Sequence, residues 1–138
     1  PELFATISAK DAQALKSFKK GSEQVAEEGI LHSYTSQQVG GGYPIIGAMG
    51  KLQFEVFQRR LKDEYNADSN IQILPYTVTR WVKPSAIGNA ENEKIPSAIK
   101  QIVDKNGNVA VLFESEWELN YFQKNAPDVQ LLLHPPVE

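Results

Sequence analysis

At the start of the chain, the hydrophobic positions change from strand-like to helix-like spacing. Leu3, Phe4 and Ile7 predict a first strand. Apolar residues then recur at helical spacing, which predicts a helix over about 11–28 that begins near an acidic cap signal. Gly29 directly follows this pattern, at the position where a left-handed backbone commonly ends a helix.

The next segments predict a hairpin followed by a second long helix. "ILHSYTS" and "YPIIGAM" have strand composition, and the polar, glycine-rich "QQVGGG" between them predicts a loop. The helix then runs to Tyr65. Its apolar positions predict one broad buried face, formed by Leu52, Val56, Phe57, Leu61 and Tyr65. Charged and polar residues gather on another side: Lys51, Glu55, Gln58, Arg59 and Lys62.

After this helix, "NIQIL" and "YTVTRWV" predict strand, with Pro75 as a bend between them. The order over residues 1–82 is therefore β-α-β-β-α-β. This order is typical of an α+β, ferredoxin-like core, with helices packed on one face of an antiparallel sheet. Residues 83–96, rich in Pro, Asn and Glu, predict a surface loop.

A C-terminal α/β extension is expected over residues 97–138, within a single domain that spans the whole chain. The pattern predicts a short helix at 97–104, a strand "NVAVLF", a second helix and a last strand "VQLLL". Ser115 and Glu118 have the spacing of a capping box, so they predict where the second helix begins.

Composition narrows the classes of protein. The 138 residues include no cysteine, which excludes disulfides and thiolate metal sites. No apolar run is long enough for a membrane span, so we expect no membrane partner and a cytoplasmic location. The net charge of −3 means that any contact with RNA has to come from a local basic patch. The chain begins at Pro1 rather than Met, so we expect it to be part of a longer protein.

The glycines and lysine before the second helix raise the question of a phosphate-binding loop. Such a loop needs a glycine five positions before the glycine of Gly-Lys and a hydroxyl directly after the lysine. Those places hold Ile45 and Leu52, so the segment predicts a tight turn instead of a nucleotide site. We expect Gly50 to adopt a backbone conformation that a β-carbon disfavours, and Gly50→Val to destabilise the fold.

Other catalytic and metal-binding patterns are missing from the sequence. His32 and His134 are far apart in the sequence and have no cysteine to join them as zinc ligands. Trp81 and Trp117 each lie in an apolar segment, which favours a role as core anchors. We therefore expect no catalytic residue, no cofactor-binding residue and no metal ligand in this chain.

Three stretches carry a resemblance to a known family. They are "LKSFKKGSEQVAEEG", "GAMGKLQFEVFQRRLKDEYN" followed by "TRWV", and "FESEWELNYFQKNAPDVQLLL". Together they resemble the C-terminal domain of bacterial peptide chain release factor 3 over nearly the whole chain. The cadence of the strand-glycine-helix stretch is also similar, more distantly, to the third domain of elongation factor G.

The resemblance implies a ribosome-docking domain of a GTPase that removes class I release factors from the ribosome after peptide release. It implies that GTP and Mg²⁺ bind in a domain outside this chain. The implied partners are the ribosome, through rRNA and ribosomal protein, other domains of the same chain and, indirectly, a class I release factor. Arg60, Lys62 and Arg80 lie within the resembling segments, and they are the candidate contacts to ribosomal phosphate.

Other interpretations remain open at this point. Glu64 can pair with Arg60, and Glu55 with Arg59, at i,i+4 spacing, so the basic residues also fit a purely solvated helix face. A stand-alone acylphosphatase-like enzyme needs an arginine in the loop after the first strand, where this chain has only Lys10. A small-molecule-binding domain could use the loop at 40–42, although no polar ligand set accompanies it.

Overall fold

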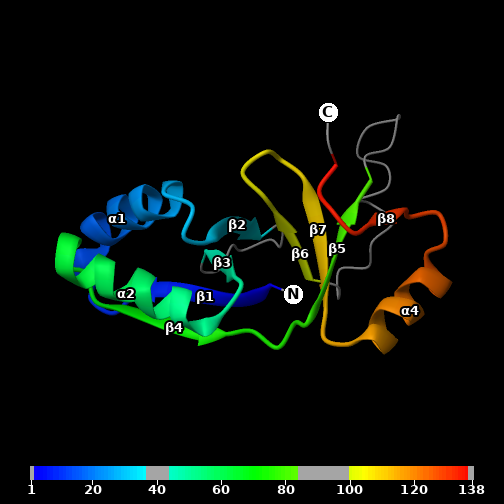
Figure 1. The fold of residues 1–138 in the computed structure, drawn as a ribbon, viewed down its shortest axis with the longest axis horizontal. Helices are drawn as coiled ribbons and strands as arrows, with labels where there is room; N and C mark the ends of the chain where they lie inside the picture. The colour runs from blue at the N-terminus through cyan, green and yellow to red at the C-terminus, as the bar shows by residue number, and fades with distance from the viewer. Residues whose placement is uncertain (1, 37–43, 84–99, 137–138) are drawn as a thin grey trace. The chain divides into compact units, whose positions relative to one another are not determined.

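The computed structural model describes residues 2–36, 44–83 and 100–136. The chain forms two compact units. The N-terminal unit comprises Pro1–Tyr34 and Gly42–Leu74, and the C-terminal unit comprises Thr35–Gly41 and Pro75–Glu138. Each unit contains helical structure (Figure 1) and has its own buried hydrophobic cluster.

The N-terminal unit has the expected ferredoxin-like arrangement. Its elements in chain order are β1 (Leu3–Ala9), the 3₁₀ turn η1 (Ala12–Ala14), α1 (Leu15–Glu27), β2 (His32–Ser36), β3 (Ile45–Ala48), α2 (Lys51–Tyr65) and β4 (Ser69–Ile73). The strands are antiparallel in the order β4-β1-β3-β2, which places β1 in the interior of the sheet. The α+β fold class and the ferredoxin-like core are confirmed.

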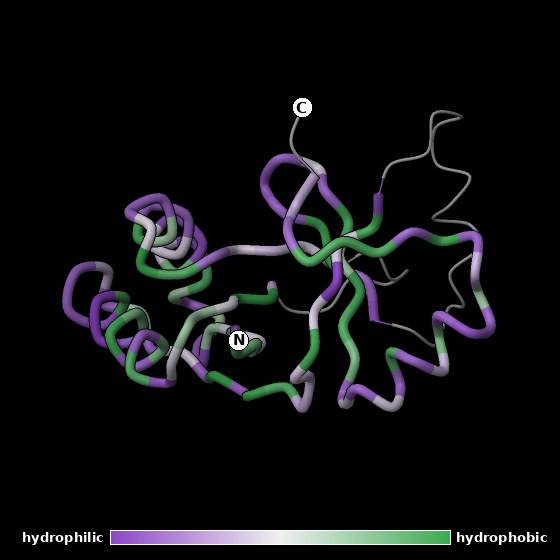
Figure 2. Tube along the Cα trace, turned by 45° about the vertical axis from the view of Figure 1, so that its right-hand side comes forward, coloured by the Kyte–Doolittle hydropathy of each residue, from purple (hydrophilic) through white to green (hydrophobic). Residues whose placement is uncertain are grey.

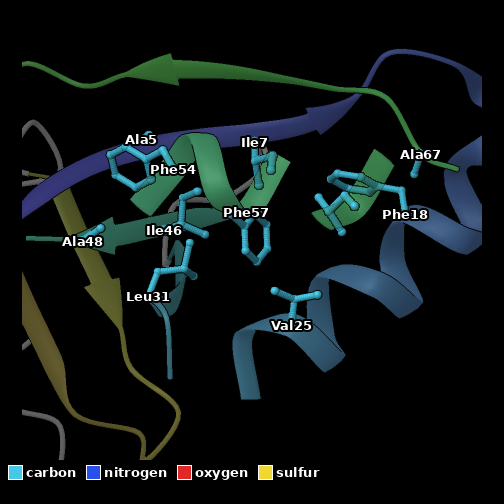
Figure 3. Packing of buried hydrophobic residues seen from close by; sticks show 11 residues of the cluster. Ala5, Ile7, Phe18, Val25, Leu31, Ile46, Ala48, Phe54, Phe57 and Ala67 are labelled. Atoms are coloured by element: carbon cyan, nitrogen blue, oxygen red, sulfur yellow. The ribbon is translucent and has the colours of Figure 1, made fainter. Parts of the chain in front are cut away.

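One face of β1 is hydrophobic throughout, and the other carries one buried aromatic residue beside Thr6 and Ser8. Ala5 and Ile7 lie in the cluster that joins the strands to both helices (Figure 3). Phe4, on the other face, packs its ring 5.9 Å from the ring of Tyr34. Each helix packs against the sheet with only one of its sides. Along both helices, hydrophilic and hydrophobic residues alternate (Figure 2).

The buried side of α2 agrees with the expected one only in part, because Phe57, Leu61 and Tyr65 pack into the core but Val56 is 38% exposed. Phe54, Phe57 and Leu61 are buried, whereas Leu52, expected on that face, is 69% exposed. The buried residues follow spacings of three and four, and Leu52 lies two positions before Phe54, about 200° around the helix. Phe54, which was not assigned to the predicted face, fills the core in place of Leu52 because its larger side chain buries more apolar surface.

The glycines before α2 also differ from expectation. Gly50 has an extended backbone with φ −158°, and a β-carbon there would meet nothing within 4 Å, so the predicted strain at this position is wrong. The close contact falls on Gly47, where a β-carbon would lie 2.7 Å from the Glu2 carboxylate. The side chain of Gln53 caps α2 instead, because its Oε1 accepts the Gly50 N–H at 2.9 Å.

Helix ends follow the sequence signals more closely. Asp11 accepts the Gln13 N–H at 2.9 Å and starts the 3₁₀ turn that leads into α1. Gly29 follows α1 with φ +83°, which confirms the predicted left-handed end. Asn66 ends α2 with φ +52°, a conformation that asparagine tolerates better than most residues.

Among the residues that the structure describes, the C-terminal unit is a second antiparallel arrangement of strands with one helix. Its elements are β5 (Val78–Val82), β6 (Lys100–Val103), β7 (Val109–Phe113), α4 (Glu116–Asn125) and β8 (Leu131–Leu132). The strand order is β6-β7-β5-β8, and the last two residues of β2 pair with β6. Strand β5, expected to continue the last strand of the ferredoxin-like core, pairs with β7 and β8 instead.

The short helix expected at 97–104 is wrong where the structure describes it. Residues 100–103 form β6, and residues 97–99 lie outside the described part of the chain. A tight turn explains the difference: Asp104 accepts the backbone N–H groups of Asn106 and Asn108 at 2.9 and 2.8 Å. This turn folds β6 back onto β7, and Ile102 is then fully buried.

Helix α4 begins as predicted but exposes its tryptophan. The Ser115 hydroxyl accepts the Glu118 N–H at 3.3 Å and so caps the helix. Leu119 and Phe122 are buried in the second cluster, together with Phe113 on β7. Trp81 on β5 is buried as expected, but Trp117 is 70% exposed, so its predicted role as a core anchor is wrong.

Gly21 allows α1 and α2 to pack closely, and this contact can be tested. A β-carbon at residue 21 would lie 2.7 Å from the Tyr65 ring and 2.9 Å from Leu61 Cδ2. We expect Gly21→Ala to destabilise the fold by about 1–3 kcal/mol, because helix and ring have to move apart. Gly50→Ser, at an extended N-cap position, is the matched control and should cost nothing. Equal urea midpoints for Gly21→Ala and the wild type would contradict this packing.

Candidate functional site

Arg60 is held between two carboxylates. It lies on α2, and its guanidinium group donates hydrogen bonds to Glu64, four residues along the same helix, and to Glu28, at the end of α1. The Arg60–Glu28 distances are 2.7 and 2.9 Å, and the Arg60–Glu64 distances are 2.6 and 3.0 Å. The expected i,i+4 pair with Glu64 is therefore present. The pair with Glu28, 32 residues away in the sequence, links α1 to α2.

This double pairing shifts the pKa values of all three groups. Hydrogen bonds from Arg60 lower the pKa of Glu28 and the pKa of Glu64 below the usual value of 4.5. Hydrogen bonds to Glu64 and then Glu28 raise the pKa of Arg60, so the guanidinium stays charged. One cation beside two anions has a net charge of −1, and an anionic cluster attracts phosphate poorly.

Lys62 lies on a different side of the same helix. Two residues along an α-helix correspond to a rotation of about 200°, so Lys62 points away from the Arg60 cluster. Its Nζ is 3.4 Å from Asp68 Oδ2, and both side chains are more than half exposed. Exposed pairs at this distance contribute little to stability, so Lys62 can exchange Asp68 for another anion at low cost.

Arg80 belongs to the C-terminal unit. It lies on β5 between Val78 and Val82, and strand alternation places it on the face of these two valines, which join the second hydrophobic cluster. Its Nη1 donates to the carbonyl of Thr79 at 2.8 Å. Within the described residues no carboxylate lies close enough to form an ion pair with Arg80, so its charge is not neutralised by them.

The structure places the three predicted contacts on two elements that belong to different units. Arg60 and Lys62 share α2 but diverge around it, and Arg80 is in the other unit. On α2, Lys62 shares its exposed side with Lys51 and Glu55, and Arg59 lies next to them. For the described residues, Glu55 and Arg59 form no ion pair with each other or with other groups.

Sequence reasoning missed the exposed large hydrophobic residues. Met49 and Leu52, at the start of α2, are 71% and 69% exposed. Trp117 and Tyr121, on α4, stack with ring centroids 5.4 Å apart and planes inclined by 16°. A signal for the aromatic pair was available: its i,i+4 spacing is out of phase with Leu119 and Phe122, which are the residues of α4 that point into the core.

A polar cluster near the start of β1 serves the fold. Glu2 accepts a hydrogen bond from the Tyr34 hydroxyl at 2.8 Å, and its other oxygen lies 2.7 Å from His32 Nδ1. The carboxylate is seated directly over Gly47. Neither histidine gathers a metal site: no group of three potential ligands occurs among residues 2–36, 44–83 and 100–136. In these same ranges, no helix combines the length and apolar character that crossing a bilayer requires.

The fold and surfaces define the class of protein: a ferredoxin-like α+β module with a charged outer helix face, joined in sequence to a second α/β unit. The model of the family described as "Class II release factor RF3, C-terminal domain" matches residues 1–123, so the chain belongs to this family.

Several curated relatives are named peptide chain release factor 3. The one from Symbiobacterium thermophilum is 38% identical over 127 residues, which cover 92% of this chain and 24% of the relative. The one from Lactobacillus helveticus is 37% identical over 131 residues, covering 95% and 24%. The one from Acaryochloris marina is 36% identical over 137 residues, covering 99% and 25%. The chain thus spans about a quarter of the length of these relatives.

The Arg60 cluster predicts a specific dependence of stability on pH. Because Glu28 and Glu64 have lowered native pKa values, their stabilisation is complete above 4.5, the usual value of the unfolded chain, and is lost as the pH falls through the native values. We expect Arg60→Gln to melt at a lower temperature than the wild type near neutral pH, and this difference to shrink below pH 4.5.

Thermal melts followed by circular dichroism between about pH 7 and pH 3 measure this difference, and the window covers both sides of the carboxylate titration. Arg59→Gln is the matched control, because Arg59 is exposed and takes part in no ion pair with the described residues. A melting difference for Arg60→Gln that stays the same size at the acid end would show that the carboxylates are not its source.

Proposed function

We propose that this chain acts as the ribosome-docking domain of a peptide chain release factor 3, which promotes dissociation of class I release factors during translation termination. The observation that carries the proposal is family membership over residues 1–123, together with relatives of that name that align with nearly all of the chain. In this proposal the domain supplies binding surfaces and has no catalytic role of its own.

The remaining parts of such a protein supply the nucleotide chemistry. GTP and Mg²⁺ bind in a GTPase domain outside this chain, and the other domains of the parent protein are direct partners of this one. The sequence supports this division, because Ile45 and Leu52 occupy the positions where a phosphate-binding loop needs a glycine and a hydroxyl. The setting for this activity is the cytoplasm.

The proposed contacts with ribosomal RNA are Arg60, Lys62 and Arg80. The exposure and the existing partners of each side chain decide how well it can bind a phosphate. Lys62 is exposed and its pairing with Asp68 is long. Arg80 has no carboxylate partner among the described residues, although its stem is half-buried. Arg60 is the weakest of the three, because two carboxylates already use its guanidinium. Lys62 and Arg80 are therefore the better phosphate ligands.

The alternatives gain no support. An acylphosphatase-like reaction needs a guanidinium in the loop after β1, and the residue there is Lys10, exposed and without an arginine beside it. The proposed small-molecule loop at 40–42 lies outside the described residues. The family match favours the release-factor role over both.

Ribosome docking can be tested with Lys62→Glu and Arg80→Gln in a full-length release factor 3 that carries this chain. Each cation that meets an rRNA phosphate releases counterions on binding. We expect each variant to bind ribosomes more weakly and to lower the slope of log affinity against log salt by about one. Ribosome affinity across a salt series and the rate of release-factor recycling are the measurements.

The control for this test is Lys105→Glu, which makes the same change of charge as Lys62→Glu at an exposed turn. Melting temperatures of all variants establish that they fold. If Lys62→Glu and Arg80→Gln both keep the affinity and salt slope of the wild type, the docking surface lies elsewhere in the protein.

GTP binding is expected of the proposed full-length protein but not of this chain. We expect the 138-residue chain to show no GTP binding by isothermal calorimetry at micromolar concentrations, with or without Mg²⁺, because its glycine turn lacks both key residues of a phosphate loop. Full-length release factor 3 measured in parallel is the positive control. Saturable heat with the isolated chain would place a nucleotide site inside it.

A further inference from the structure

The exposed face of α4 has a feature that the proposed RNA contacts do not use. Trp117 and Tyr121 remain 70% and 59% exposed even though their rings stack on each other. They lie on the side of the helix away from Leu119 and Phe122, which fill the hydrophobic cluster of the C-terminal unit. The fold therefore does not bury this pair. Tryptophan and tyrosine in such positions are the residues that most often dominate the energy of protein interfaces.

The charges around the pair are mostly negative. Glu114, Glu116 and Glu118 surround the first turn of α4 beside Trp117. Burial, and then the charges of nearby Glu114 and Glu118, raise the pKa of the Tyr76 phenol. No cation among the described residues pairs with any of the three. Lys124, seven residues after Trp117, is the nearby cation of this helix, and the carboxylates outnumber it.

These charges select among the partners that an aromatic surface can bind. RNA bases stack well on aromatic rings, but their phosphates would meet three carboxylates that no cation of the described residues neutralises. A second copy of this chain would bring the same carboxylates against themselves. A guanidinium group has the opposite preferences: it stacks on the face of an indole ring and pairs with carboxylates at the same time.

We propose that Trp117 and Tyr121, with Glu114, Glu116 and Glu118 around them, form a docking surface for an arginine-rich segment of a partner protein. An arginine side chain stacks on the exposed Trp117 ring, and neighbouring cations pair with the carboxylates. The surface chemistry does not depend on the ribosome. Only the choice of a ribosomal protein as the source of the segment rests on the proposed function, and at this surface the charges favour ribosomal protein over ribosomal RNA.

The test uses a short arginine-rich peptide as the probe and NMR signals of the indole N–H groups as the readout. The chain has two tryptophans, and Trp117→Phe assigns their signals. We expect the peptide to shift the signal of exposed Trp117 and to leave that of buried Trp81 in place. Trp117→Ala should weaken peptide affinity about fivefold, and Trp117→Phe should restore part of it, as expected for a cation stacked on a ring.

Matched variants and probes separate this surface from general attraction between a basic peptide and an acidic protein. Leu133→Ala removes an equally exposed hydrophobic residue of the same unit and should leave affinity unchanged. Glu116→Gln with Glu118→Gln should weaken binding and its salt dependence, whereas Glu55→Gln on α2 should not. A peptide with citrulline in place of arginine should bind poorly.

Several results would overturn the proposal. They are an unchanged affinity in Trp117→Ala, a tighter response of the Trp117 signal to single-stranded RNA than to the peptide, and a shift of that signal with protein concentration alone. The first excludes the aromatic pair, the second makes the partner a nucleic acid, and the third makes it a second copy. Because no ribosome enters this experiment, its failure leaves the salt-dependence test of Lys62 and Arg80 unaffected.

Discussion

Gly21 sets the distance between α1 and α2, and the arrangement of the N-terminal unit depends on this distance. With no side chain at Gly21, the Tyr65 ring and Leu61 can occupy the space that a β-carbon would fill. The Tyr65 hydroxyl then reaches Gln24 on α1, and the end of α1 comes within reach of Arg60. The ionic contacts between the helices are thus a consequence of steric fit: a longer separation would leave Glu28 too far from the guanidinium.

The contact between α1 and α2 also decides which charged residues of α2 are free to bind an anion. A helix with several basic residues looks uniformly cationic in sequence, yet packing against α1 gives Arg60 two carboxylates and leaves Lys62 on the outer side with a distant one. Electrostatic capacity to bind an anion therefore belongs to individual residues and their neighbours, and a count of lysines and arginines does not measure it.

Much of the fold could be predicted from local pattern. The order of elements through β4 follows from hydrophobic spacing, and the ends at Gly29 and Ser115 follow from cap chemistry. Two of the errors share one physical cause, which is that contacts between distant segments override local preference. Residues 100–103 become a strand because β7 lies beside them, and Leu52 is exposed because Phe54 occupies the core in its place.

The candidate site was less predictable than the fold for the same reason. Glu28 and Arg60 are 32 residues apart, and nothing in either local sequence signals their contact. Trp117 was assigned to the core because it lies in an apolar segment, although its phase relative to Leu119 and Phe122 already placed it outside. Here the position of a residue around the helix, relative to residues that are buried, predicts its burial better than the residue type does.

The position of β1 in its sheet has a consequence for the order of events during synthesis. This strand is made before the other strands of its unit, but its partners are β3 and β4, and the pairing of Ala5 with Ile73 spans almost the whole unit. Until β4 has been made, one edge of β1 has no partner and its hydrophobic side chains lack their full cover. The β6–β7 hairpin, closed by the turn at Asp104, needs only its own neighbours. The N-terminal unit can therefore complete its fold only after its last strand, β4, has been made. The β6–β7 hairpin can form as soon as both of its strands have emerged.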